Sequence, residues 1–313
     1  MPEEMKQEIP GTAEQTETPE AAGQQGKGRK EKEKKSVGRE ILSWVFTLLG
    51  AVIVALAIRS LIFEPIRVDG ASMNDTLANG EAMFVSKLDY ASTWFSFPWQ
   101  SDEAKENAAR ITTGFGSPSQ FDVVIVRYPG RGDTNFVKRL IGLPGDRVKL
   151  EGGYLYVNGE KYEEPYINDE YRVAGGSNGE TFAEVYIPKA GDMLKLDYLD
   201  EAKTRIGMYV GGEAWGWRGI CSDAVSSDGQ RLSYDRSGAL TLNGEDISGN
   251  TAKIQELVGK EFRLEKDLYF VMGDHRKVSI DSRNKTVGPV DSEQLVGKLT
   301  LRIWPLSRMG AID

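Results

Sequence analysis

Two residues set far apart in the chain, Ser72 and Lys138, could together perform nucleophilic catalysis. A serine hydroxyl is a weak nucleophile until a neighbouring base removes its proton. Lysine is ordinarily a poor base, because a pKa near 10.4 keeps it charged at neutral pH, but burial among apolar groups lowers that pKa. Lys138 follows Phe136 and Val137 in an apolar run, which suits such burial. Taken alone, the run is better explained by a lysine whose ammonium reaches water, as most strand lysines do.

The composition excludes several other kinds of site. The chain has 313 residues, a net charge of −8 and one cysteine, Cys221, so it has neither an intrachain disulfide nor a cysteine-based metal cluster. His275 is the single histidine, so a His-rich metal site is impossible, and a Ser-His-Asp triad would have to use this residue. We therefore expect no metal and no cofactor, and the chain shows no DNA-binding module that would indicate a nucleic-acid partner.

An apolar segment near the N-terminus predicts a membrane anchor over residues 41–63. Ile41–Ile58 has no charged residue, and its length meets the threshold for a spanning helix. Residues 27–40 carry an excess of basic side chains, which puts the N-terminal side in the cytoplasm and the rest of the chain outside. A cleaved signal peptide is the alternative, because Ala55–Ala57 resembles a cleavage site, but the apolar segment and its polar leader are too long for one.

The remainder of the chain predicts a mainly β protein with antiparallel sheets. Short apolar runs alternate with glycine-containing turns, and a helix is expected only near residues 102–109. Residues 147–162 predict a hairpin with Asn158-Gly159 as its type I′ turn. Residues 190–196 and 239–245 echo this pattern, which indicates either an internal duplication or two ordinary hairpins.

Three short stretches, in this order and behind an anchor, resemble the sequence boxes of bacterial type I signal peptidases, which are Ser/Lys membrane proteases. The first has Ser72-Met73 and Thr76-Leu77, the second has Phe136–Arg139 and Gly142–Asp146, and the third has Met272–Asp274, Arg276, Ser279 and Asp281–Arg283. Residues 121–129 and 297–306 also fit the family. A single anchor is similar to the Gram-positive members.

The resemblance implies two antiparallel β-sheet domains of the type I signal peptidase fold, with one N-terminal transmembrane helix. Residues 1–40 would form a disordered cytoplasmic tail. Residues 64–175 and 262–313 would form the catalytic β domain, and 176–261 an enlarged second β domain inserted in it.

The resemblance also assigns roles by position. Ser72 is expected to be the nucleophile and Lys138 the general base, with Ser279 orienting the lysine amine. The Ser72 N–H is one expected oxyanion donor. Where some members carry a hydroxyl this chain has Gly70, so the second donor would be a backbone N–H or a water. Structural ion pairs are expected between Asp274 and Arg139 and between Asp281 and Arg283.

The family removes N-terminal signal peptides from exported preproteins, cleaving after small residues in Ala-X-Ala-like sites. A substrate docked as a β-strand would point both small side chains the same way. The residues expected to line the pockets are Ile66, Val68, Met73 and Val137, which ordinary core packing would explain equally well. The implied partners are preproteins and the lipid bilayer, with the protein in the cell membrane. The alternatives are an inactive or dedicated signal-peptidase-like pilus or surface assembly protein and a self-cleaving repressor-type protease.

The chain departs from the family pattern in four places. Asp75 replaces the usual Pro, His275 replaces the usual Asn, and insertions occupy 91–120 and 176–261. We expect His275 to support the site rather than to act as a base, with a histidine triad as the alternative. The aromatic residues of the first insertion are expected either to contact the bilayer interface or to pack against one another: Trp94, Phe95, Phe97 and Trp99.

Overall fold

The computed structural model describes most of the chain after residue 36. The described residues are 37–74, 76–89, 92–94, 110–112, 116–131, 134–172, 181–216, 220, 222–235, 237–284 and 287–312. Several predictions lie outside them: the tail as far as residue 36, the helix at 102–109, and the aromatic side chains of the first insertion. Asp75 and Cys221 also lie outside the described residues.

Helix α1 (Val37–Leu61) covers the predicted anchor at 41–63 except for its last two residues, the second of which begins β1 (Phe63–Arg67). Within α1, Gly38–Arg59 is long and apolar enough to cross a membrane, and its side chains are exposed in the structure. Glu40 in the first turn and Arg59 in the last complement the helix dipole. The chain divides into two units after Leu49, inside this helix.

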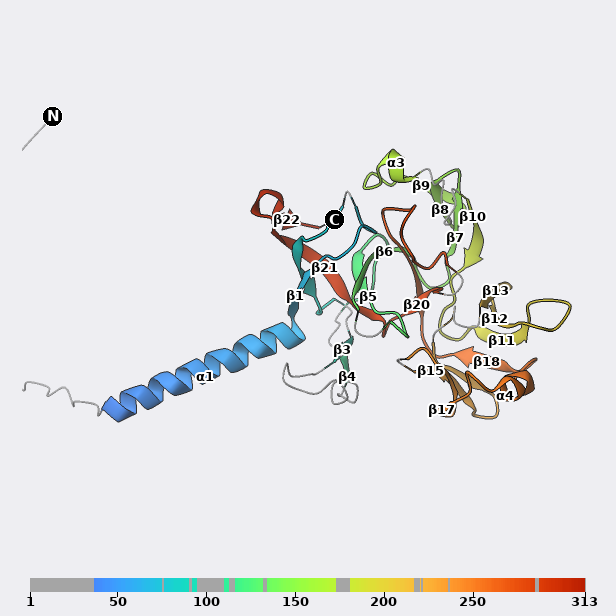
Figure 1. Cartoon of the computed structure of the whole chain (residues 1–313), viewed down its shortest axis with the longest axis horizontal. Helices are drawn as coiled ribbons and strands as arrows, with labels where there is room; N and C mark the ends of the chain where they lie inside the picture. The colour runs from blue at the N-terminus through green and yellow to red at the C-terminus, as the bar shows by residue number, and fades with distance from the viewer. Residues whose placement is uncertain are drawn as a thin grey trace, which may run out of the picture. The chain divides into compact units, whose positions relative to one another are not determined.

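The main sheet brings together strands from both ends of the chain (Figure 1). Its eight strands run in the order β1-β2-β21-β5-β6-β19-β20, with β22 paired to β21. Their bounds are β1 Phe63–Arg67, β2 Ala82–Ser86, β21 Leu295–Trp304, β5 Val123–Val126, β6 Phe136–Gly142, β19 Leu268–Met272, β20 Val290–Asp291 and β22 Gly310–Ala311. All pairs are antiparallel, as the sequence predicts.

The predicted hairpin at 147–162 is a meander of three strands. Strands β7 (Arg147–Glu151), β8 (Tyr154–Val157) and β9 (Glu160–Tyr162) pair in succession, and β10 (Phe182–Tyr186) adds to β7. Asn158 and Gly159 have φ values of 53° and 82° and form the turn between β8 and β9. Only glycine and asparagine adopt this left-handed conformation readily, which is why the Asn-Gly pair marks the turn.

A second eight-stranded sheet has the order β13-β12-β11-β18-β14-β15-β16-β17. Its strands are β11 Met193–Tyr198, β12 Ile206–Val210, β13 Glu213–Gly216, β14 Ala224–Ser226, β15 Arg231–Tyr234, β16 Leu240–Leu242, β17 Glu245–Asp246 and β18 Glu261–Leu264. The remaining elements are β3 Ser92–Trp94, β4 Arg110–Thr112, α3 Asp169–Arg172, α4 Thr251–Glu256 and η1 Leu306–Arg308.

The resemblance of residues 190–196 and 239–245 to the predicted hairpin extends to the turns but not to the strand pairing. Asn243 and Gly244 repeat the left-handed turn, with φ values of 52° and 83°. Whereas β7 pairs directly with β8, β11 pairs with β12 and β18, and β16 pairs with β15 and β17. The two echoed segments therefore have different neighbours.

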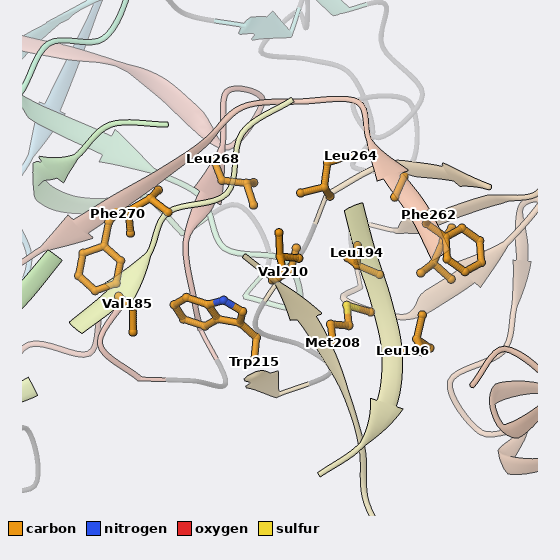
Figure 2. Packing of buried hydrophobic residues seen from close by; sticks show 14 of the residues in the cluster. Val185, Leu194, Leu196, Met208, Val210, Trp215, Phe262, Leu264, Leu268 and Phe270 are labelled. Atoms are coloured by element: carbon orange, nitrogen blue, oxygen red, sulfur yellow. The ribbon is translucent and has the colours of Figure 1, made fainter. Parts of the chain in front are cut away.

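One hydrophobic core joins the main sheet to the second large sheet. Leu268 and Phe270 of β19 belong to the same buried cluster as Val185 of β10 and Trp215 of β13 (Figure 2). The mainly β, antiparallel architecture with one apolar N-terminal helix confirms the predicted fold class. The domain division at 176 and 261 stays a prediction, and strands near both limits pair across it: β10 with β7, and β18 with β11 and β14.

Candidate active site

Ser72 and Lys138 lie in hydrogen-bond contact although 66 positions separate them. Ser72 occupies the loop between β1 and β2, and Lys138 lies on β6 opposite Val124 of β5. Lys138 Nζ is 2.9 Å from Ser72 Oγ and 3.0 Å from the carbonyl oxygen of Val137. These are the two acceptors of Nζ in the part of the chain that the structure describes. The pair has the nucleophile–base geometry of covalent catalysis.

The Lys138 side chain is only 2% exposed. Burial is the main cause that lowers the Lys138 pKa from 10.5 to about 8. The carboxylates of Asp281 and Asp274 raise this pKa, and the Arg283 guanidinium lowers it further. A pKa of about 8 leaves roughly a tenth of the lysine neutral at pH 7, since each pH unit below the pKa is a factor of ten. The buried strand thus supplies an amine that can accept a proton at ordinary pH.

The loop that carries Ser72 is held by its own hydrogen bonds. Leu77 N–H donates to the carbonyl oxygen of Met73 at 2.7 Å, and Asn74 N–H donates to that of Ala71 at 3.2 Å. Gly70, at the position where some members carry the second oxyanion donor, has φ +113°, and its N–H donates to Asn79 Oδ1 at 3.2 Å. The Ser72 N–H, by contrast, donates to none of the described residues.

The third box is fastened to the lysine strand by a buried ion pair. Arg139 donates from Nε to Asp274 Oδ1 at 3.1 Å and from Nη2 to Asp274 Oδ2 at 2.9 Å. Thr76 Oγ1 donates to the same Oδ2 at 2.6 Å, which ties the serine loop to both. The register places Arg139 opposite Met272 on β19. A bidentate arginine–carboxylate pair fixes orientation as well as distance. The pair therefore fixes the position of Asp274, and with it the third box, relative to β6.

A second buried ion pair joins two residues within the third box. Arg283 contacts Asp281 through Nε and Nη2, each at 2.8 Å, and Asp281 also accepts the Gly273 N–H at 3.0 Å. Burial alone raises the pKa of Asp281, but the charge and hydrogen bonds of Arg283, with those of Gly273 and Ser279, bring it below its ordinary value. Asp281 is therefore a carboxylate whose charge is compensated.

Ser279 is fully buried in the third box. Its hydroxyl contributes to the lowered pKa of Asp281, and its expected role in orienting the lysine amine stays a prediction. A side chain at Gly273 would overlap both the Ser279 side chain and the Ser72 carbonyl group. Glycine at this position therefore permits the close approach of the third box to the nucleophile loop.

The four expected substrate-contacting residues belong to one apolar cluster. Val68 and Met73 are 5% and 1% exposed, so they form the buried base of the cluster. Ile66 and Val137 are partly exposed and pack against it. Of these four residues, Ile66 and Val137 therefore present the exposed apolar surface, and Ile66 lies on β1, the terminal strand of the main sheet.

The structure adds a buried network that the sequence patterns do not reveal. Glu164, 1% exposed, pairs with Arg276 at 2.5 Å and accepts the Tyr166 hydroxyl at 3.0 Å. The Arg139 guanidinium stacks on the Tyr166 ring, 3.7 Å from its centre. In the sequence, nothing distinguishes Glu164 from Glu163, whose side chain is 85% exposed.

The C-terminal arm also contacts the serine loop. Arg302 of β21 donates from Nη2 to the carbonyl oxygen of Thr76 at 2.6 Å. Buried Glu81 pairs with Arg302 at 3.1 Å and with Arg308 at 2.8 Å. Thr76 is therefore held both by Asp274 of the third box and by Arg302 of β21.

A serine bonded to a buried lysine of lowered pKa, in a mainly β protein behind an apolar helix, defines a candidate Ser/Lys hydrolase. The chain belongs to the signal peptidase family: residues 41–304 match the family model described as "Signal peptidase, peptidase S26". It is accordingly a serine endopeptidase of the signal peptidase I type, related to proteins of Bacillus and Staphylococcus.

Two relatives and one solved structure are matches to the chain. The chain is 34% identical over 283 residues to "Signal peptidase I" of Bacillus licheniformis, covering 90% of this chain and 99% of that protein. It is 27% identical over 280 residues to "Signal peptidase I P" of Bacillus subtilis subsp. natto, covering 90% and 96%. A crystal structure of a signal peptidase I from Enterococcus faecalis V583 aligns with 21% identity and a TM-score of 0.28, over 59% of this chain and 97% of that one.

Proposed function

We propose that this protein removes N-terminal signal peptides from exported preproteins, cleaving after Ala-X-Ala-like sites with Ser72 as nucleophile and Lys138 as general base. The observation that carries the proposal is the 2.9 Å contact between Lys138 Nζ and Ser72 Oγ in a buried setting. The family membership and the relatives named signal peptidase I support the substrate class.

The reaction would proceed in two stages. Neutral Lys138 takes the proton of Ser72 as Oγ attacks the scissile carbonyl, and the Ser72 N–H stabilises the oxyanion that forms. The lysine then gives its proton to the leaving amine, which releases the mature protein and leaves the signal peptide as an ester on Ser72. In the second stage Lys138 takes a proton from water, and the resulting hydroxide equivalent hydrolyses the ester and regenerates the serine.

The preprotein would bind as an extended strand along β1. A terminal strand offers unpaired backbone groups for added pairing. The side chains at the first and third positions before the cut point the same way, toward the surface formed by Ile66 and Val137. We propose that Val68 and Met73 shape this surface from beneath. The shallow surface favours small residues at both positions.

Helix α1 is proposed to anchor the protein in the cell membrane in a single pass. The basic residues at 27–40 favour a cytoplasmic N-terminus, so the catalytic part would lie on the extracytoplasmic side, where exported preproteins emerge. The bilayer and the preproteins are then the partners of the protein. The ion pairs Arg139–Asp274 and Arg283–Asp281 are proposed to hold the third box in place, with Ser279 orienting the lysine amine.

The test is cleavage of a preprotein by the detergent-solubilised full chain, with the cut mapped by mass spectrometry. Lys138→Arg and Ser72→Ala should fold and lose cleavage, because guanidinium stays protonated and alanine has no nucleophile. Lys149→Arg is the matched control, since Lys149 is a partly exposed strand lysine on β7. Normal cleavage by Lys138→Arg would refute the mechanism.

A further inference from the structure

His275 contacts both peptide groups that flank the nucleophile. Its ring Nδ1 is 3.1 Å from the carbonyl oxygen of Ala71, and its backbone N–H donates to the carbonyl oxygen of Ser72 at 3.0 Å. A carbonyl oxygen can only accept, so Nδ1 carries the hydrogen in this contact. The first carbonyl belongs to the peptide group joining residues 71 and 72, and the second to the group joining Ser72 and Met73.

A trans peptide group is planar, and its C=O and N–H point in opposite directions. The Ala71 C=O and the Ser72 N–H belong to the same group, so fixing one fixes the other. By holding the Ala71 oxygen, the His275 ring aims the Ser72 N–H away from the third box. That N–H donates to none of the described residues and remains free to bind a developing negative charge.

We propose that His275 is a positioning residue for the oxyanion donor of Ser72. The proposal rests on the proposed function, in which Ser72 is the nucleophile and its N–H stabilises the oxyanion. A preorganised donor stabilises the transition state without having to reorient during the reaction. His275 acts through the backbone, and the hydroxyl of Ser72 is bonded to Lys138 and not to the ring.

The residues on either side of His275 hold it in a fixed position, which allows its ring to orient the peptide group. Its sequence neighbours Asp274 and Arg276 are buried, at 1% and 2% exposure, and each is held in an ion pair, with Arg139 and Glu164 respectively. Asn74 N–H also donates to the Ala71 oxygen, at 3.2 Å, but it belongs to the same loop and moves with it. The His275 ring therefore connects the 71–72 peptide group to the part of the third box that these ion pairs hold in place.

The ring needs to donate only one hydrogen bond and needs no charge. An Nδ1–H is present in one neutral tautomer and in the charged imidazolium alike. An asparagine amide nitrogen occupies nearly the same place relative to the backbone as Nδ1, so His275→Asn keeps a donor. His275→Leu keeps the branching and removes the donor, and both variants keep the backbone N–H to Ser72.

The experiment compares these variants as full-length proteins in detergent, with a preprotein as substrate. We expect His275→Asn to retain kcat within about threefold and His275→Leu to lose about 10- to 100-fold in kcat with little change in KM. An oxyanion donor acts in the transition state, and its complete removal costs about 100- to 1,000-fold. His275→Ala repeats the loss of the donor without adding an apolar side chain, and Lys277→Leu, in the same loop, is the control.

Melting temperatures separate positioning from folding. The proposal is supported when the Leu and Ala variants melt near the wild type and lose kcat, and when Asn restores it. Equal kcat in the Leu and Asn variants overturns it, as does a loss that appears only in KM or that follows the melting temperature. Activity in Ser72→Ala would instead overturn the proposed function, so the two failures are distinguishable.

Discussion

Replacing Lys138 by methionine should stabilise the protein at neutral pH, although it abolishes cleavage. The folded state lowers the lysine pKa from 10.5 to about 8. Because the folded value lies below the unfolded one, the unfolded chain binds more protons between pH 8 and 10.5, so the free energy of unfolding rises with pH across that window. At 1.36 kcal/mol per pKa unit, the wild type should gain about 2.5 kcal/mol between pH 7 and pH 10 from this group alone.

Methionine has a similar length and no proton to exchange, so Lys138→Met should lack this gain. The assay is thermal unfolding of the full chain in detergent at pH 7 and pH 10, for the variant and the wild type side by side. For a chain of this size about 1 kcal/mol shifts the melting temperature by 2–4 °C, so the advantage of the variant should shrink by about 5–10 °C from pH 7 to pH 10. An advantage that does not change with pH would show that burial does not perturb the lysine.

Two further predictions follow from the same site and from the anchor. The pH profile of kcat/KM should rise with an apparent pKa near 8, because the base must be neutral and burial lowers the pKa of Lys138 to about 8; a rise only near 10.4 would contradict a buried base. Protease added to intact spheroplasts should degrade residues 65–313 and spare the N-terminal tail, as detected with antibodies to each part. Protection of the catalytic part would reverse the proposed orientation.

The sequence patterns predict the antiparallel strands and the anchor because both depend on local periodicity and composition. The three boxes likewise indicate which residues gather around Ser72, since a short motif carries its own residue types. The sequence does not predict which group accepts a hydrogen bond from a given backbone N–H in a loop. Nothing near Gly70 indicates that Asn79 accepts its N–H. That contact depends on how the loop closes, which is a property of the whole sheet.

The position of Ser279 shows the same limit. The motif predicts a hydroxyl near the lysine. Which neighbouring group this hydroxyl contacts is decided by the packing of the whole site. In the structure the Ser279 hydroxyl lowers the pKa of Asp281, whose carboxylate Arg283 holds within the third box. The burial of Glu164 could not be predicted either, because its partner Arg276 comes from a distant part of the chain.

The strand order of the main sheet determines when activity can arise during synthesis. The loop that carries Ser72 lies between β1 and β2, and Lys138 lies on β6, next to β5. Between these two halves runs β21, which pairs with β2 on one side and with β5 on the other. Because β21 comes from residues 295–304, we expect the contact between Ser72 and Lys138 to form only after this segment has been made and has entered the sheet. Peptidase activity should then be absent from a nascent chain that lacks β21.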